Sequence, residues 1–174
     1  QVGDAYQNVG VGNESLRSNT TGKYNSAVGY RALFTSTTAN DNSAFGREAL
    51  YANTTGASNV GIGYQAAYTN TTGHSNSFVG WRAGYSNTTG VQNSSLGREA
   101  LRNNTTASVN TGIGYSALTA NTTGASNTAV GGGALGANTT GAQNNALGHK
   151  ALEKNTTGNS NPAFGYDALG ENLV

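Results

Sequence analysis

The chain has no cysteine, no methionine and a single proline among its 174 residues, and only 10% of them are charged. The lack of cysteine excludes disulfides and thiolate metal sites, and it suits a protein exposed outside the cell. The formal net charge of +1 gives no reason to expect nucleic acid or an anionic membrane surface as a partner. The sequence has no signal peptide and no long apolar run, so we expect no direct membrane insertion.

What the sequence does have is a repeat of seventeen residues that runs through the whole chain. The segment 53–69 reads NTTGASNVGIGYQAAYT, and the next copy begins at Asn70. A fixed period without insertions indicates a solenoid in which each copy forms one coil. We predict an all-β fold, a parallel β-solenoid of about ten coils stacked at the strand spacing of about 4.8 Å. Because no distinct capping sequence is present, residues 1–174 are expected to be one domain, a segment of a longer fibre.

Residues seventeen apart form columns, and three columns are predicted to make the core. The first is apolar in every copy and mostly β-branched or aromatic, as expected of an inward strand position. It consists of Val11, Val28, Phe45, Ile62, Val79, Leu96, Ile113, Val130, Leu147 and Phe164. The other two are a leucine column from Leu16 to Leu169 and the alanine column directly before it.

One exchange of volume supports a shared interior. Gly84 replaces leucine in the copy in which Phe78 is the only bulky member of a column of small residues. We predict that Phe78 fills the missing volume. The same small column, which includes Gly10, Ala27 and Ala44, is also a candidate for close approach between chains.

Glycine and asparagine each occupy a column in every copy. The glycines are expected to form a corner with positive φ or close backbone approach, and they include Gly29, Gly46, Gly63, Gly80, Gly97 and Gly114. The asparagines are expected to form an amide ladder between coils, and they include Asn25, Asn42, Asn59, Asn76 and Asn93.

Charged and aromatic residues stack in neighbouring columns. Opposite charges are vertical neighbours in Glu14–Arg31–Glu48, in Arg82–Glu99 and in Lys150–Asp167, which helps to fix the register of the coils. Guanidinium groups alternate with rings, and Arg47 between Tyr30 and Tyr64 is one example. A further aromatic strip is expected to be an interface between chains or packing, or else to contact sugar rings. It consists of Phe34, Tyr51, Tyr68 and Tyr85.

The sequence shows no group of residues with the pattern of a catalytic or metal-binding site. His74 and His149 are far apart in the array, so we predict no catalytic or metal site, no cofactor and no enzymatic activity. Paired threonines satisfy turn hydrogen bonds in the simplest interpretation, and as an exposed ladder they are typical of ice-binding surfaces. The Asn-Thr-Thr turns also match the N-glycosylation pattern, at Asn19, Asn53, Asn70, Asn87, Asn104, Asn121, Asn138 and Asn155.

The segment 25–33, NSAVGYRAL, and its equivalents such as Asn127-Thr128-Ala129-Val130-Gly131 resemble the head repeats of YadA-like trimeric autotransporter adhesins. They are still more similar to the NTAVGYxAL repeats of bacterial surface proteins and phage tail fibres. The adhesin repeat is shorter, near fourteen residues, so the Asn-Thr-Thr-Gly turn is a departure from it. The resemblance implies a left-handed parallel β-roll, three chains together, and display outside the cell or on a virion.

The predicted function is therefore a structural or adhesive segment of an extracellular fibre, a homotrimer or another self-assembling homo-oligomer, with a host-surface or glycan ligand. Three alternatives stay open. They are a self-stacking extracellular filament, an ice-binding solenoid that uses a threonine column, and a glycan-binding module that uses the aromatic strip. A solenoid can present any of these surfaces, so the fold alone does not choose among them.

Overall fold

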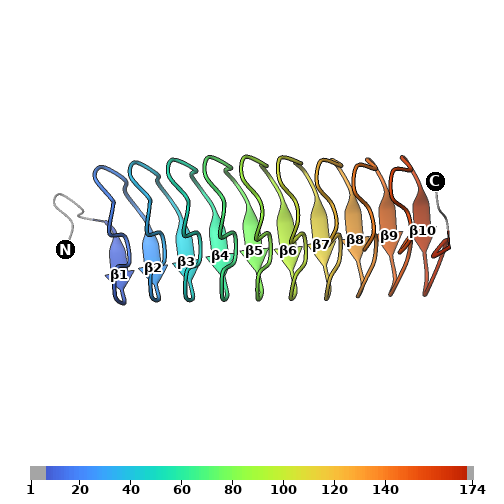
Figure 1. Ribbon diagram of the computed structural model, residues 1–174, viewed down its shortest axis with the longest axis horizontal. Coiled ribbons are helices and arrows are strands. Elements are labelled where there is room, and N and C mark those ends of the chain that lie inside the picture. Colours follow the sequence, from blue (N-terminus) through green and yellow to red (C-terminus); the bar gives the residue numbers. More distant parts are fainter. Residues whose placement is uncertain (1–6, 172–174) are drawn as a thin grey trace.

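The structure, a computed structural model, describes residues 7–171, and it is an all-β parallel solenoid (Figure 1). Ten three-residue strands form one sheet in sequence order, and every pair of neighbours is parallel. The strands are β1 (Val9–Val11), β2 (Ser26–Val28), β3 (Ser43–Phe45), β4 (Val60–Ile62), β5 (Ser77–Val79), β6 (Ser94–Leu96), β7 (Thr111–Ile113), β8 (Thr128–Val130), β9 (Asn145–Leu147) and β10 (Pro162–Phe164).

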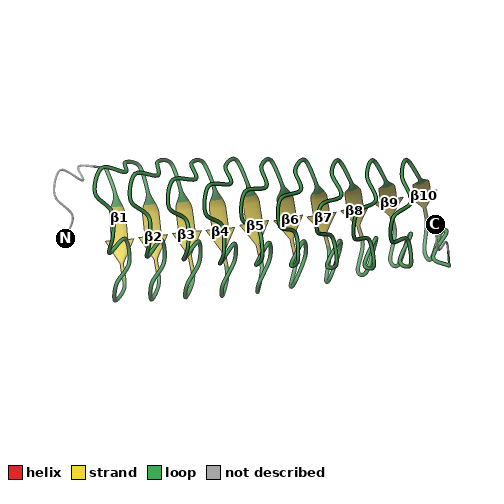
Figure 2. Cartoon of the chain, turned by 45° about the horizontal axis from the view of Figure 1, so that its top comes forward, coloured by secondary structure: helices red, strands yellow, loops and turns green. Residues whose placement is uncertain are grey.

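The sheet register follows the sequence repeat. Ala27 of β2 pairs with Ala44 of β3, and Ala44 pairs with Gly61 of β4, so each partner lies seventeen residues further on. We call each strand with the loop that follows it a coil and number the coils as their strands; coil 8 is thus 128–144. Loops flank the row of strands on both sides (Figure 2). The predicted fold class and register are confirmed.

In β2 to β10 the middle residue of each strand faces the inside of the coil, and the outer two point away from it. Ala27, Ala44 and Phe78 are fully buried, whereas Phe45 and Ile62 are each 40% exposed. The prediction that the column from Val11 to Phe164 forms the core is therefore wrong. Strand residues alternate between faces, and the narrow coil admits the small column instead. The proposed close approach of chains through that small column is wrong for the same reason.

The apolar interior consists of this small column together with the leucine and alanine columns. The leucines adopt a left-handed backbone, with φ of 50° at Leu33 and 51° at Leu50. Such a conformation costs an L-residue about 1–2 kcal/mol. Burial and a coil-to-coil hydrogen bond offset this cost, because the Leu33 amide donates to the Ala49 carbonyl at 3.1 Å.

Phe78 fills the space that the missing leucine side chain leaves in coil 5. It is fully buried, and a Cβ added at Gly84 would stand 2.3 Å from its Cδ1. The φ of Gly84 is 57°, close to that of the leucines in the same column. The predicted exchange of volume within a shared core is confirmed.

The glycine corner requires both a positive φ and a close approach of the next coil's backbone, the two features that the sequence suggested. Gly29 has a φ of 137°, and a Cβ there would lie 2.4 Å from the Gly46 carbonyl oxygen of the next coil. The same holds along the column, since Gly80 has a φ of 140° and an equally close carbonyl. A side chain at this corner would therefore push two coils apart.

The other part of the interior is lined by asparagines in two ladders. In the first amide ladder, which includes Asn25, Asn42, Asn59, Asn76 and Asn93, each side-chain oxygen accepts the backbone N–H of the next asparagine, as from Asn59 to Asn42 at 2.9 Å. This predicted ladder is confirmed. The second amide ladder is made by the asparagines of the Asn-Thr-Thr turns, and its side chains bond directly to one another, as from Asn87 to Asn70 at 2.8 Å. This second ladder was not predicted from the sequence.

Candidate interaction surfaces

The outward face of the sheet carries an apolar residue in every coil. We call the third strand residues the apolar stripe, which consists of Val11, Val28, Phe45, Ile62, Val79, Leu96, Ile113, Val130, Leu147 and Phe164. Seven of them are exposed, and Leu96 and Leu147 retain about half of their accessible surface. Ten strands at about 4.8 Å make the stripe about 43 Å long. A contiguous apolar surface of this kind is a mark of an interaction site.

The Asn-Thr-Thr turn presents a second regular surface. The second threonine of each pair is exposed in nine successive coils, and we call these residues the threonine ladder. They are Thr21, Thr38, Thr55, Thr72, Thr89, Thr106, Thr123, Thr140 and Thr157. The first threonine of each pair instead donates its hydroxyl proton to the next coil, as Thr71 does to the Thr88 carbonyl at 3.1 Å. The column of first threonines therefore satisfies hydrogen bonds of the turn, as in the simplest interpretation of the sequence.

The predicted glycosylation sites are inaccessible in the folded chain. Asn53, Asn70, Asn87, Asn104, Asn121 and Asn138 are fully buried, Asn155 is too, and Asn19 is 8% exposed. The Asn87 amide nitrogen donates both to the Asn70 side chain and to the Gly90 carbonyl at 3.1 Å. The prediction of glycosylation at these asparagines is therefore wrong for the folded protein, because the nitrogen that would carry a sugar lies inside the amide ladder.

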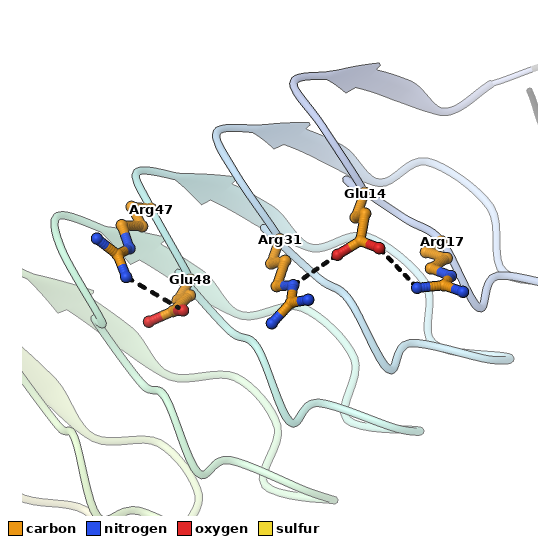
Figure 3. Close-up of polar contacts among 5 residues, drawn as sticks. All are labelled: Glu14, Arg17, Arg31, Arg47 and Glu48. Atoms are coloured by element: carbon orange, nitrogen blue, oxygen red, sulfur yellow. Dashed lines mark hydrogen bonds and ion pairs between the residues drawn. The ribbon is translucent and has the colours of Figure 1, made fainter.

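An ion-pair network joins the first two coils on the charged face (Figure 3). Glu14 lies between Arg31 of the next coil, at 2.5 Å, and Arg17 of its own coil, at 2.6 Å. The hydrogen bond from Arg31 is the main reason why the pKa of Glu14 is lowered. The predicted vertical pair Glu14–Arg31 is confirmed.

The other vertical charge pairs are replaced by different contacts. Glu48 accepts a hydrogen bond from Gln65 at 2.8 Å and lies 3.8 Å from Arg47 of its own coil. Glu99 lies near Arg98 and Arg102 of its own coil, at 3.9 and 3.7 Å. Lys150 lies 3.3 Å from Glu153. Long side chains reach along their own coil as readily as across the coil spacing, so a column pattern alone does not fix the partner.

Rings and guanidinium groups alternate along the neighbouring column as predicted. The Arg47 guanidinium lies 5.8 Å from the Tyr30 ring and 5.6 Å from the Tyr64 ring. Arg98 lies in the same way between Trp81 and Tyr115, at 4.9 and 5.8 Å. These distances are within the range of cation–π attraction.

The aromatic strip is a stack of half-buried rings. Phe34, Tyr51, Tyr68 and Tyr85 follow one another with centroids 5.1, 5.0 and 5.2 Å apart and nearly parallel planes. Burial is the main reason why the pKa of Tyr68 is raised. Because each inner ring already contacts two others, the strip offers edges rather than free ring faces to a ligand.

His74 and His149 lie in coils 4 and 9 and do not converge. Among residues 7–171, no three His, Cys, Asp or Glu side chains are grouped as a metal ion would require. Nor does the part of the chain that the structure describes contain a helix that could cross a membrane.

No protein-family model matches the chain, and neither a curated protein nor a solved structure is significantly similar to it. The resemblance to adhesin and tail-fibre repeats therefore stays a prediction from the repeat residues.

Proposed function

We propose that the chain is a structural segment of an extracellular fibre, in which three copies associate lengthwise through the apolar stripe. The observation that carries this proposal is the apolar residue that every strand places on the outside of the coil. Covering such side chains contributes about 25 cal/mol for each Å² removed from water.

The occupant that best fits the stripe is a second copy of the same chain. The stripe has the same chemistry at every coil, so a copy aligned in parallel meets apolar side chains along the full length. A net charge of +1 gives little repulsion between copies. Homo-oligomers close by symmetry, and three stripes facing a common axis cover one another; the resemblance of the repeats also favours three chains.

The mass in solution tests this association. Light scattering should give three times the 17.6 kDa of one chain. The double variant Leu96→Lys/Ile113→Lys should dissociate to monomers, because each copy would place two charges in the shared interface. Circular dichroism should remain that of the parent, since both side chains point away from the core.

The matched control is Thr89→Lys/Thr106→Lys, which adds the same charges to neighbouring coils on the threonine ladder. This control should stay trimeric. A parent chain that is monomeric at all concentrations overturns the proposal, and so do lysines that disrupt association equally at both places. Long threads of undefined mass would instead favour end-to-end stacking of exposed strand edges.

A second candidate function, ice binding, is favoured by the threonine ladder. Nine exposed methyl and hydroxyl groups recur at one coil spacing, about 4.8 Å. The ladder is one residue wide, and the next column along the chain that is exposed in every coil is mixed, with Tyr24, Asp41 and Val109 among its members. Thermal hysteresis in the parent, lost in Thr72→Tyr/Thr89→Tyr, would support this function; a parent without hysteresis removes it.

A further inference from the structure

One coil lacks side chains at three neighbouring positions of the charged and aromatic face. Gly132 stands in the column that holds Tyr64, Trp81 and Tyr115 in earlier coils. In the same coil, Gly133 interrupts the charged column and Gly136 interrupts the column that contains the aromatic strip. Coil 8 therefore leaves a gap across this face, which we call the notch.

The notch is a cleft of about 440 Å³. Its floor includes Gly132, Gly133 and Gly136 of coil 8. Coils 7 and 9 supply the walls, with Tyr115 and Thr119 on one side and His149, Lys150 and Glu153 among those on the other. This volume lies within the range of about 300–1,000 Å³ that is typical of small-ligand sites.

The two walls present ring faces to the gap. Tyr115 is 59% exposed, and the next position of its column, Gly132, has no side chain to cover the ring on the coil 8 side. His149 stacks on Tyr166 of coil 10, with centroids 5.5 Å apart and planes within 8°, so its other face is directed toward coil 8. The imidazole leans over Gly132, because its Cδ2 would lie 3.3 Å from a Cβ placed there.

The spacing of the coils sets the thickness of a ligand. The backbones of coils 7 and 9 lie two strand spacings apart, about 9.6 Å. Carbon contacts of about 3.5–4.0 Å on each side take up most of that distance, so the gap has room for a single ring.

The polar groups at the rim favour a neutral ligand with hydroxyl groups. Lys150 and Glu153 form an ion pair of 3.3 Å, and Lys154, which also lines the notch, pairs with Glu171. The notch therefore offers donors and acceptors close together with no net charge from these groups. The Thr119 hydroxyl, on the opposite wall, can donate and accept. Adjacent hydroxyls of a sugar match such a pair, and apolar sugar C–H groups pack on ring faces.

We propose that the notch binds one neutral pyranose ring of a glycan, held between Tyr115 and His149 in the place of the side chain that Gly132 lacks. Tyr115 and His149 contact the two faces of the sugar, and Lys150, Glu153 and Thr119 bond its hydroxyls. The site lies within one chain, so it does not depend on the association of three copies.

Saturation-transfer NMR with the full chain tests the site, and the probes are cellohexaose, maltohexaose and lactose. At least one of these neutral sugars should give a signal. Gly132→Tyr inserts the residue found elsewhere in the column and should abolish it, while melting temperature and oligomer mass stay those of the parent. Tyr115→Ala should weaken binding at least tenfold by titration of the best probe.

The matched control is Tyr64→Ala, which removes a ring from the same column four coils before the notch and should leave sugar binding unchanged. The proposal is overturned if no neutral probe binds at 10 mM, if Gly132→Tyr binds as the parent does, or if sialyllactose or indole binds better than all three neutral sugars. Light scattering on the same samples separates a failure of this site from a failure of the trimer.

Discussion

The interior of each coil has two halves that are held together by different physical means. Beside the Asn-Thr-Thr turn, the amide half contains two ladders of buried asparagine bonded from coil to coil. Between the strand and the leucine turn, the apolar half contains Leu, Ala and other small side chains. The two halves share one backbone, one coil spacing and the same near-complete burial. Comparing them therefore shows what an apolar core and a hydrogen-bonded amide core each require of their side chains.

The apolar half tolerates exchanges that the amide half does not show. Leucine is replaced by Ala67 and Gly84, with Phe78 supplying volume from another column. An apolar core needs volume in roughly the right place, whereas a buried amide needs partners at fixed distances and angles. The one exception among the Asn-Thr-Thr asparagines is Ser36, and its hydroxyl is buried without a partner.

The largest effect is expected from breaking the amide half. Asn87→Ala removes the bonds from Asn87 to Asn70 and Gly90 and the acceptor of the Asn104 amide at 2.9 Å. The Asn70 oxygen is left unpaired, at about 1–3 kcal/mol, whereas the Gly90 carbonyl and the Asn104 amide each keep one other bond and lose about 1 kcal/mol. With the cavity that the amide leaves, the free energy of unfolding should fall by roughly 3–6 kcal/mol. Thermal melting followed by circular dichroism measures this loss, with the exposed Asn103→Ala as a control. Equal melting of the two variants would show that the ladder contributes little.

Emptying the apolar half should cost slightly less. Phe78→Ala is expected to lower the free energy of unfolding by about 3–5 kcal/mol, the range for truncated buried aromatics. The double variant Phe78→Ala/Gly84→Leu should recover most of the loss, because it restores the pattern of the other coils and Gly84 already has a φ of 57°. Gly84→Leu alone should destabilise through its clash with Phe78. Chemical denaturation of the three variants, beside the half-buried Tyr85→Ala, checks this order.

Repairing the gap in the amide half should stabilise the chain. Ser36→Asn supplies a donor to the Asn19 side-chain oxygen, which is buried without a partner, and an acceptor for Asn53. We expect a gain of about 1–2 kcal/mol, the value of the unpaired groups that become bonded. Ser77→Asn is the matched control, because Ser77 is exposed and its column already contains Asn145. A melting temperature that rises no more than in this control contradicts the ladder repair.

A smaller gain should come from relieving strain at the corner beside the amide half. Val109 has a φ of 62° and is 53% exposed, a conformation that β-branched residues rarely adopt. Val109→Asn should raise the free energy of unfolding by about 1 kcal/mol, since asparagine tolerates the left-handed region. Thr106→Asn, on an exposed position of the same turn without a positive φ, should change melting little. Differential scanning calorimetry of the pair gives the comparison.

The smallest effect concerns pH. Amides do not titrate, so the amide half should hold its strength from pH 8 to pH 5. Glu14 has a lowered pKa, mainly because Arg31 bonds to it. Its contribution is therefore complete above its unfolded pKa of about 4.3 and is lost as pH falls through the lowered folded value. Melting curves below pH 4.5 should show a small loss that Glu14→Gln lacks; an equal loss in both chains would contradict this assignment.

Much of this fold was predictable, because the repeat fixes the coil length, the strand register and the glycine corner. Which face of each strand points into the coil was not predictable in the same way. Alternation places Ala27 and Val28 on opposite faces but does not say which face is inside, and size favoured valine. The exchange between Phe78 and Gly84 held the answer, since a small column that trades volume with the core must lie within it and its neighbours must then point outward.

The surfaces were harder to predict for a different reason. The asparagine of each Asn-Thr-Thr turn has the pattern of a glycosylation site, and only the buried geometry reveals it as a ladder. The notch depends on Tyr115 and His149, which are 34 residues apart in the sequence and come together only because coils stack. The run Gly131-Gly132-Gly133 was the available signal, but a glycine run alone does not indicate a cleft.

The coil-to-coil hydrogen bonds, such as Leu33 to Ala49 and Asn59 to Asn42, have a mechanical consequence. They run along the length of the rod, so a pull applied to the two ends of the chain loads the junctions between coils one after another. The weakest junction then yields first while the others remain intact. Each yielded coil releases seventeen residues, which span about 56–61 Å when extended. A rod built in this way is expected to lengthen by one coil at a time under tension and so to dissipate the applied load in steps.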